Sequence, residues 1–227
     1  MNKSGEDTQA NVTKPLLLEA GSNNDPNTVD GRLTPLAVTD AKSPKFLVHK
    51  NIICHYSPYF SAAFNGNFVE GRTKTINLDV DEKAFGILVN WLYTQDIFSE
   101  NGDQPSLAPL ARLWIMAEEF LMPEFQDQAM REIYNGVKES GVKSFYQDFG
   151  HFTEIACQHG TGDNPLVDIG LWTLGWCQFD FVSRHMDRIP GAMVKQALLY
   201  FKEKGAAERD KDFYERKVSA FYVSKDT

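Results

Sequence analysis

Residues 46–97, FLVHKNIICHYSPYFSAAFNGNFVEGRTKTINLDVDEKAFGILVNWLYTQDI, place strand, helix, strand and helix patterns in one short span. Ser57-Pro58 predicts a helix start, because serine caps free backbone N–H groups and proline is preset for the first helical position. Residues 74–80 alternate between apolar and polar, which is typical of a half-buried strand. Asp81 is placed to cap the next helix. The span contains no recognisable catalytic set, so it indicates a binding module rather than an enzyme.

Both flanks of this span extend the pattern. Upstream, the short apolar runs 36–38 and 45–48 are separated by a turn-like cluster and predict a hairpin. Pro35 weakens the first strand, since proline cannot donate to a ladder and belongs at an edge. Downstream, residues 107–122 carry an apolar stripe at helical spacing, and Pro123 separates them from a second amphipathic helix. Short connections of this kind favour antiparallel helix pairs.

These patterns divide the chain into four parts. Residues 1–30 are polar and predict a disordered N-terminal tail, because they hold too little apolar surface to offset the entropy of ordering. A strand-and-helix domain covers residues 31–138, and a helical extension covers residues 144–204. Residues 205–227 form a charged tail, in which Phe221 and its aromatic neighbours allow either docking on the body or contact with a partner.

Composition restricts the classes of function. The 227 residues carry a net charge of -8, which disfavours nucleic-acid binding because affinity for phosphates depends on clustered Lys and Arg. No apolar run reaches the ~20 residues that a membrane span needs, and the N-terminus lacks the apolar core of a secretory signal. Three cysteines without CxxC spacing fit a reducing compartment. We therefore expect an intracellular protein, cytoplasmic or nuclear or both, that binds neither nucleic acid nor membrane.

The strand-helix order resembles the BTB (POZ) domain, and within that family the small BTB-domain proteins of filamentous fungi. The resemblance covers residues 33–137, and its order and spacing are specific although each piece alone is weak. The matching pieces are Phe46-Leu47-Val48-His49-Lys50, Ser57-Pro58-Tyr59-Phe60, Phe68-Val69-Glu70-Gly71, Ala84-Phe85 and Trp91-Leu92-Tyr93-Thr94. It implies an α+β fold, with a small, mostly antiparallel sheet flanked by a helical cluster and followed by an all-α C-terminal extension.

The resemblance also implies protein partners. Phe68-Val69-Glu70 fits the hydrophobic-x-Glu pattern with which similar BTB adaptors contact a cullin scaffold, and an apolar side chain beside a Glu suits such an interface. The alternative is that Phe68 packs on its own domain and Glu70 is a solvated loop charge. Residues 33–38 have no Asp immediately before them, unlike members with a swapped N-terminal strand. No kelch, MATH, ankyrin or zinc-finger sequence follows the domain.

Catalytic, metal and cofactor sites are not predicted. His49 is interpreted as a hydrogen-bonded structural histidine after a strand, because no nucleophile or carboxylate is spaced with it. Phosphate-binding glycine loops and hydrolase motifs are absent from the sequence. Two groups invite a zinc interpretation but satisfy no standard spacing: Cys54 with His55, and His151 with Cys157 and His159.

The sequence therefore predicts a non-enzymatic protein-interaction module. Its narrower form is a substrate adaptor of a cullin-RING ubiquitin ligase, with Phe68, Val69 and Glu70 in the contact and the C-terminal half recruiting a target. The alternative is a scaffold or transcriptional co-regulator that forms homo- or hetero-oligomers and has no DNA-binding activity of its own. An enzyme of unrecognised type has support only from the helical half, where no chemistry is visible.

Overall fold

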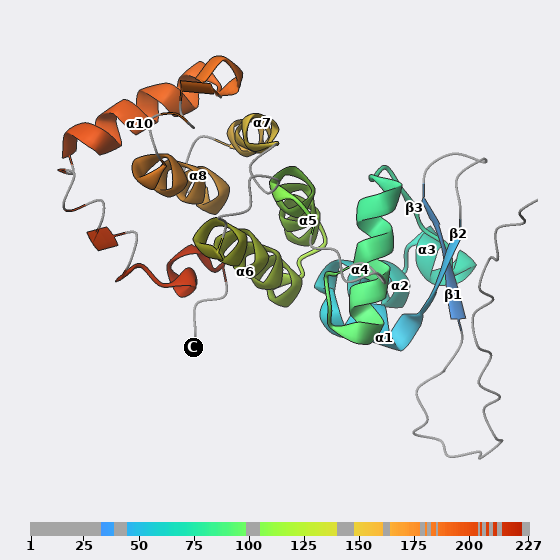
Figure 1. Cartoon of the computed structure of the whole chain (residues 1–227). Helices are drawn as coiled ribbons and strands as arrows, with labels where there is room; N and C mark the ends of the chain where they lie inside the picture. Colours follow the sequence, from blue (N-terminus) through green and yellow to red (C-terminus); the bar gives the residue numbers. More distant parts are fainter. Residues whose placement is uncertain are drawn as a thin grey trace, which may run out of the picture. The chain divides into compact units, whose positions relative to one another are not determined.

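A computed structural model describes most of the chain beyond residue 32 (Figure 1). The described residues are 33–38, 45–98, 105–139, 148–160, 164–177, 180, 183–184, 186–203, 205, 208, 211–212 and 215–223. The predicted N-terminal tail, residues 1–30, lies outside them, as do parts of the predicted charged tail. No helix in the described part is long and apolar enough to cross a membrane.

A three-stranded sheet of order β2-β1-β3 begins the structure. Strand β1, Leu33–Val38, pairs antiparallel with β2, Lys45–His49, which confirms the predicted hairpin. Strand β3, Asn77–Leu78, pairs parallel with the end of β1, at Ala37 and Val38. The expectation that Pro35 belongs to an edge strand is wrong, because β1 is the central strand of this sheet. Pro35 lies before Ala37, where the pairing with β3 begins, so its missing N–H is outside the β1–β3 ladder.

The α+β prediction is confirmed in part, since the described residues are mainly helical and contain few strand residues. Of the predicted strand 74–80, only Asn77–Leu78 makes ladder bonds. Its predicted alternation still holds, because Ile76 and Leu78 are buried while Asn77 is exposed. The sheet is mostly antiparallel, as predicted, because β1 and β2 share five paired positions whereas the parallel pairing of β1 with β3 has two.

Four helices accompany the sheet in the N-terminal half: α1 Lys50–Tyr56, α2 Pro58–Asn65, α3 Val69–Thr73 and α4 Glu82–Thr94. Both predicted caps are confirmed. The Ser57 hydroxyl accepts a hydrogen bond from the Phe60 N–H at 3.1 Å and donates one to the Phe120 carbonyl at 2.6 Å. The Asp81 carboxylate accepts from the Ala84 N–H at 2.8 Å. Ser57 is fully buried, so its side chain joins α2 to the distant end of α5.

Helices α5, Leu107–Glu119, and α6, Pro123–Glu139, pack against each other as predicted. They are joined by a tight turn in which Leu121 takes a left-handed φ of 54° and the Met122 N–H bonds the Ala117 carbonyl. Trp91 of α4 donates its indole N–H to Gln128 of α6 at 2.6 Å. Helix α4 is thereby tied to this helix pair within the same domain.

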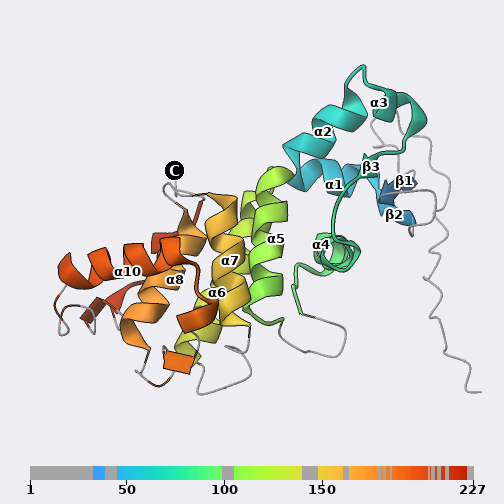
Figure 2. The ribbon, with the colours of Figure 1, turned by 90° about the horizontal axis from the view of Figure 1, so that it is seen from above.

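The C-terminal half is helical, as predicted from its apolar stripes (Figure 2). Its elements are α7 Phe149–His159, α8 Pro165–Trp176, the 3-10 turn η1 Met186–Arg188, α10 Gly191–Glu203 and the 3-10 turn η2 Val218–Phe221. Helix α7 packs on α5 and α8, and α8 also contacts α10. The predicted start of α8 is confirmed, because Asn164 accepts from the Leu166 N–H at 2.9 Å and Pro165 is the first helical residue.

Residues 215–223, which we name the C-terminal strap, dock across α6 and α8. Phe221 is 1% exposed, and its ring lies near the rings of Trp172 and Tyr134. The Tyr134 hydroxyl donates to the Arg216 carbonyl at 2.6 Å, and Asp127 accepts from the Val223 N–H at 2.8 Å. Of the two alternatives for the tail, docking on the body is the one that these residues adopt.

Candidate protein-interaction site

The connection between α2 and α3 is tightly packed and fixes where Phe68 emerges. The Gly66 N–H bonds the Ala62 carbonyl at the end of α2. A Cβ on Gly66 would lie 2.6 Å from that same carbonyl oxygen, and one on Gly71 would lie 2.6 Å from the Gly66 carbonyl oxygen. Since real Cβ atoms do not approach so closely, both positions require glycine in this geometry. The two glycines therefore allow α3 to turn back against the end of α2.

Phe68, Val69 and Glu70 open helix α3, where the sequence predicted a loop. That prediction is wrong: Phe68 is the N-cap residue, and Val69 and Glu70 lie in the first turn. The helix is held by hydrogen bonds from the Thr73 hydroxyl to the Val69 carbonyl and from the Lys74 N–H to the Glu70 carbonyl. With five residues and none of them buried, α3 lacks the apolar periodicity by which a helix is predicted from sequence.

The apolar side chains at the start of α3 face solvent. Phe68 is 61% exposed and Val69 is 58% exposed, whereas Glu70 is partly buried. The edge of the Phe68 ring covers the Gly66 backbone, and most of the ring remains outside the core. Glu70, in the first turn, is favoured by the positive end of the helix dipole. The three predicted residues thus form one small exposed surface, the α3 patch, with an acidic side chain at its border.

His49 has the structural role that the sequence indicated. It follows β2 directly and precedes α1 as its N-cap residue. The Tyr93 hydroxyl accepts a hydrogen bond from the His49 N–H at 3.0 Å and forms a second with His49 Nδ1 at 2.9 Å. These bonds fix the end of the strand to α4.

Three of the residues that invited a zinc interpretation contact protein groups. His151 Nε2 lies 2.9 Å from the Arg112 guanidinium, and His159 Nε2 lies 2.5 Å from Glu118, so both histidines join α7 to α5. Cys54 donates to the Phe60 carbonyl at 3.6 Å. Across the described residues, no three His, Cys, Asp or Glu side chains gather as a metal site.

The cysteine thiols are poor nucleophiles at neutral pH. Burial raises the pKa of Cys54, an effect that the charges of Lys50 and Lys74 partly offset. Burial likewise raises the pKa of Cys157, and that of Cys177 to about 12. Because the thiolate is the reactive form, each of these shifts lowers the reactivity of the thiol.

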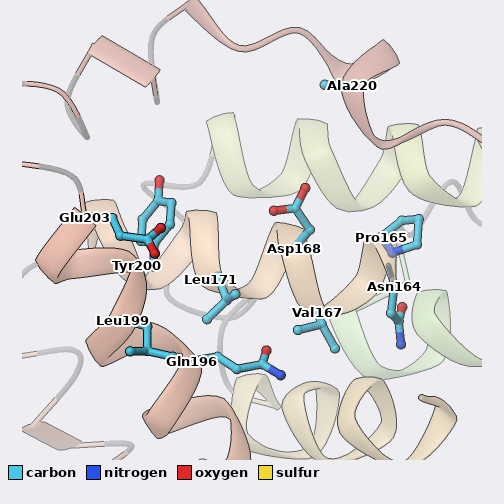
Figure 3. Close-up of a pocket in the computed structure, with 10 residues that line it drawn as sticks. All are labelled: Asn164, Pro165, Val167, Asp168, Leu171, Gln196, Leu199, Tyr200, Glu203 and Ala220. Atoms are coloured by element: carbon cyan, nitrogen blue, oxygen red, sulfur yellow. The ribbon is translucent and has the colours of Figure 1, made fainter. Parts of the chain in front are cut away.

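The helical half contains a hollow that the sequence did not predict, the α8–α10 groove (Figure 3). Its volume is about 500 Å³, and its lining comes from α8, α10 and Ala220 of the C-terminal strap. The lining residues are separated by tens of positions along the chain. No local pattern brings them together, so only the packing of the helices reveals the groove.

Comparisons with known proteins identify the N-terminal half. A family model of the BTB/POZ domain matches residues 36–135. The chain is 26% identical over 126 residues to Kelch repeat and BTB domain-containing protein 8 of Xenopus tropicalis, and 25% identical to the protein of that name from Rattus norvegicus. Each match covers 54% of this chain but only 20% and 21% of the respective relative, so the chain matches about a fifth of their length. Residues 36–135 are a BTB/POZ domain, a member of a family of protein-interaction domains.

Proposed function

We propose that this protein is an intracellular adaptor whose BTB domain contacts a cullin scaffold through the α3 patch and whose C-terminal helices recruit a target for ubiquitination. The observation that carries the proposal is the joint exposure of Phe68 and Val69 beside Glu70 at the start of α3. This is the segment that, in similar BTB adaptors, carries the hydrophobic-x-Glu pattern.

The physical basis is burial of apolar surface on binding. A large aromatic side chain that enters a partner's groove is the type of residue that dominates interface energies, with truncation costing about 2 kcal/mol or more. Glu70 adds complementarity to a basic group on the partner, which favours the correct orientation. The rigid connection through Gly66 and Gly71 supports this role, because a preorganised side chain loses little entropy on binding.

A binding measurement with the full chain and the host's BTB-binding cullin tests the proposal. We expect retention of the wild-type chain and a loss of at least tenfold in affinity for Phe68→Ala combined with Glu70→Lys. Leu198→Ala is the matched control, since Leu198 is also 61% exposed but lies on α10. No binding by the wild-type chain, or equal binding by the double variant, would refute the cullin contact and leave a BTB interaction module with other partners.

A self-associating scaffold or transcriptional co-regulator is the second candidate function. It is favoured by Leu47, which is 57% exposed on β2, one of the two outer strands of the described sheet. An outer strand with an exposed apolar side chain is a site for pairing with another chain. Light scattering after gel filtration is the test: we expect an oligomer that Leu47→Glu dissociates, and a wild-type monomer at micromolar concentration would rule out this function.

A further inference from the structure

The α8–α10 groove lies in the helical half, and none of its lining residues belongs to the α3 patch. Figure 3 shows side chains of α8 and α10 on its two sides and Ala220 of the C-terminal strap at its margin. Its volume of about 500 Å³ lies within the range of sites that hold small ligands or a few side chains. Leu171 of α8 and Leu199 of α10 both line it.

Helix α8 is unusually apolar for a helix with an open face. Apart from Asp168 and Thr173, all of its residues are apolar or glycine. A helix that is apolar on all sides is typical of a fully buried position. Helix α8 does pack against α7, α10 and η2, but Leu171 is only partly buried and borders the groove. Across the groove, Leu199 of α10 is 54% exposed. Both leucines would lose further contact with water if an apolar side chain entered.

The charge of the groove restricts the occupant. Its charged lining residues are Asp168 and Glu203, and none of the described lining residues is Lys or Arg. Arg216 of the strap pairs with Asp168, but Glu203 is exposed and is the last residue of α10. The carboxylate therefore adds to the negative end of the helix dipole. Lys202 lies in the same last turn but does not line the groove, so within the lining Glu203 favours a cationic side chain over a phosphate group.

We propose that the α8–α10 groove binds a short segment of a partner protein in which a leucine-sized side chain lies beside a Lys or Arg. Leu171 and Leu199 receive the apolar side chain, and Glu203 pairs with the basic one. The proposal specifies the class of segment that the adaptor would recruit. Binding of the segment is independent of the cullin contact, and only its role in recruiting a target rests on the proposed function.

Selection from a display library of random 12-residue peptides on the full chain provides the probe. Enriched peptides are then synthesised, and their affinities are measured by fluorescence anisotropy. We expect them to combine a Lys or Arg with Leu, Ile, Met or Phe. Affinity falls about tenfold for Leu199→Glu, which places a charge where the apolar anchor binds, and several-fold for Glu203→Lys.

Leu198→Glu is the matched control and leaves the affinity unchanged. Leu198 is 61% exposed on the same helix, but it lines a separate small hollow with Leu174 and Phe201. Because Leu198, Leu199 and Glu203 are all exposed, the three variants keep the fold, which circular dichroism verifies. Phe68→Ala with Glu70→Lys also leaves peptide affinity unchanged, so loss of cullin binding and loss of peptide binding are separate results.

Any of these peptide results overturns the proposal: no peptide enriches, the enriched peptides lack basic residues, they bind the Leu199→Glu chain equally well, or they are lost with Leu198→Glu. A second copy of the chain is the competing occupant. Light scattering detects it as a wild-type dimer that Leu199→Glu converts to a monomer, and that result overturns the proposal as well.

Discussion

Phe68 and Phe221 are both phenylalanines at short helical segments, yet they lie in opposite environments. Phe68, at the start of α3 in the BTB domain, is 61% exposed. Phe221, in the C-terminal strap, is 1% exposed and lies beside aromatic rings from α6 and α8. The first side chain is available to a partner, whereas the second completes the core of its own chain.

The two halves of the chain use their aromatic side chains differently. The BTB domain buries its own aromatic side chains, such as Phe60 and Phe85, and still leaves the α3 patch exposed. The helical half covers Trp172 of α8 with a ring supplied from far along the chain. The aromatic residue type therefore does not distinguish binding from packing in this protein. Exposure does.

The strongest test of this comparison is Phe221→Ala. We expect the free energy of unfolding to fall by about 3–5 kcal/mol, because the substitution leaves a cavity among Trp172, Tyr134 and the guanidinium of Arg216, which lies 4.3 Å from the ring centroid. Urea denaturation followed by tryptophan fluorescence measures the loss.

Phe68→Ala is the matched control and is expected to change stability by no more than about 0.5 kcal/mol, as is usual for exposed positions. Similar losses for the two variants would mean that the contrast in exposure does not exist in solution.

Arg216→Met tests how much the charges of the strap add to the burial of Phe221, and its expected loss of stability is smaller. The substitution removes the ion pairs with Asp168 and Asp212 and the cation above the Phe221 ring, but keeps an apolar stem. We expect a loss of about 1–2 kcal/mol in the same denaturation assay, since the guanidinium is mostly buried but the carboxylates are partly solvated.

Lys211→Met controls for loss of charge alone. Lys211 is highly exposed and pairs with Glu215 at 3.8 Å, so its removal should cost no more than about 0.5 kcal/mol. If Arg216→Met costs as little as this control, the strap is held by Phe221 and not by its charges.

The features that sequence predicted are those encoded over a few residues. Ser57-Pro58 and Asp81 cap the expected helices, because capping depends on a side chain and an amide three positions away. Helix α1 was missed because it follows β2 without a break and its N-cap, His49, makes no side-chain cap. Residues 68–70 remain a predicted contact site, and their helix was too short to predict from the sequence.

The features that escaped prediction depend on contacts between distant residues. The bond from Tyr134 to Arg216 spans 82 positions, and no periodicity within either segment indicates it. The α8–α10 groove likewise combines helix faces that are each typical of core. Local patterns predict the elements, whereas these sites are produced by their packing.

Alkaline pH should destabilise the helical half through Tyr200 of α10. Burial, together with the nearby charge of Asp212, raises the pKa of Tyr200 to about 12 from an ordinary value of 10.0. The folded state therefore keeps this proton to higher pH than the unfolded state does. The stabilising contribution is fully present below pH 10 and is lost as pH rises from about 10 to 12. Denaturation at pH 9 and pH 11 measures the decline, and Tyr200→Phe should reduce it.

The smallest predicted effect concerns the reactivity of cysteine thiols rather than stability. It compares the alkylation rate of a thiol in the BTB domain with that of a thiol in the helical half. Burial raises the pKa of Cys54, in the BTB domain, but the charges of Lys50 and Lys74 partly offset this rise. Burial raises the pKa of Cys177, which follows α8, to about 12. At pH 8.5 iodoacetamide should therefore alkylate Cys54 well before Cys177, because only the thiolate reacts. Peptide mass spectrometry over a time course gives the order, and urea should make the two rates equal. Faster alkylation of Cys177 in native buffer would contradict this order and would require the helical half to open around this thiol more often than the BTB domain opens around Cys54.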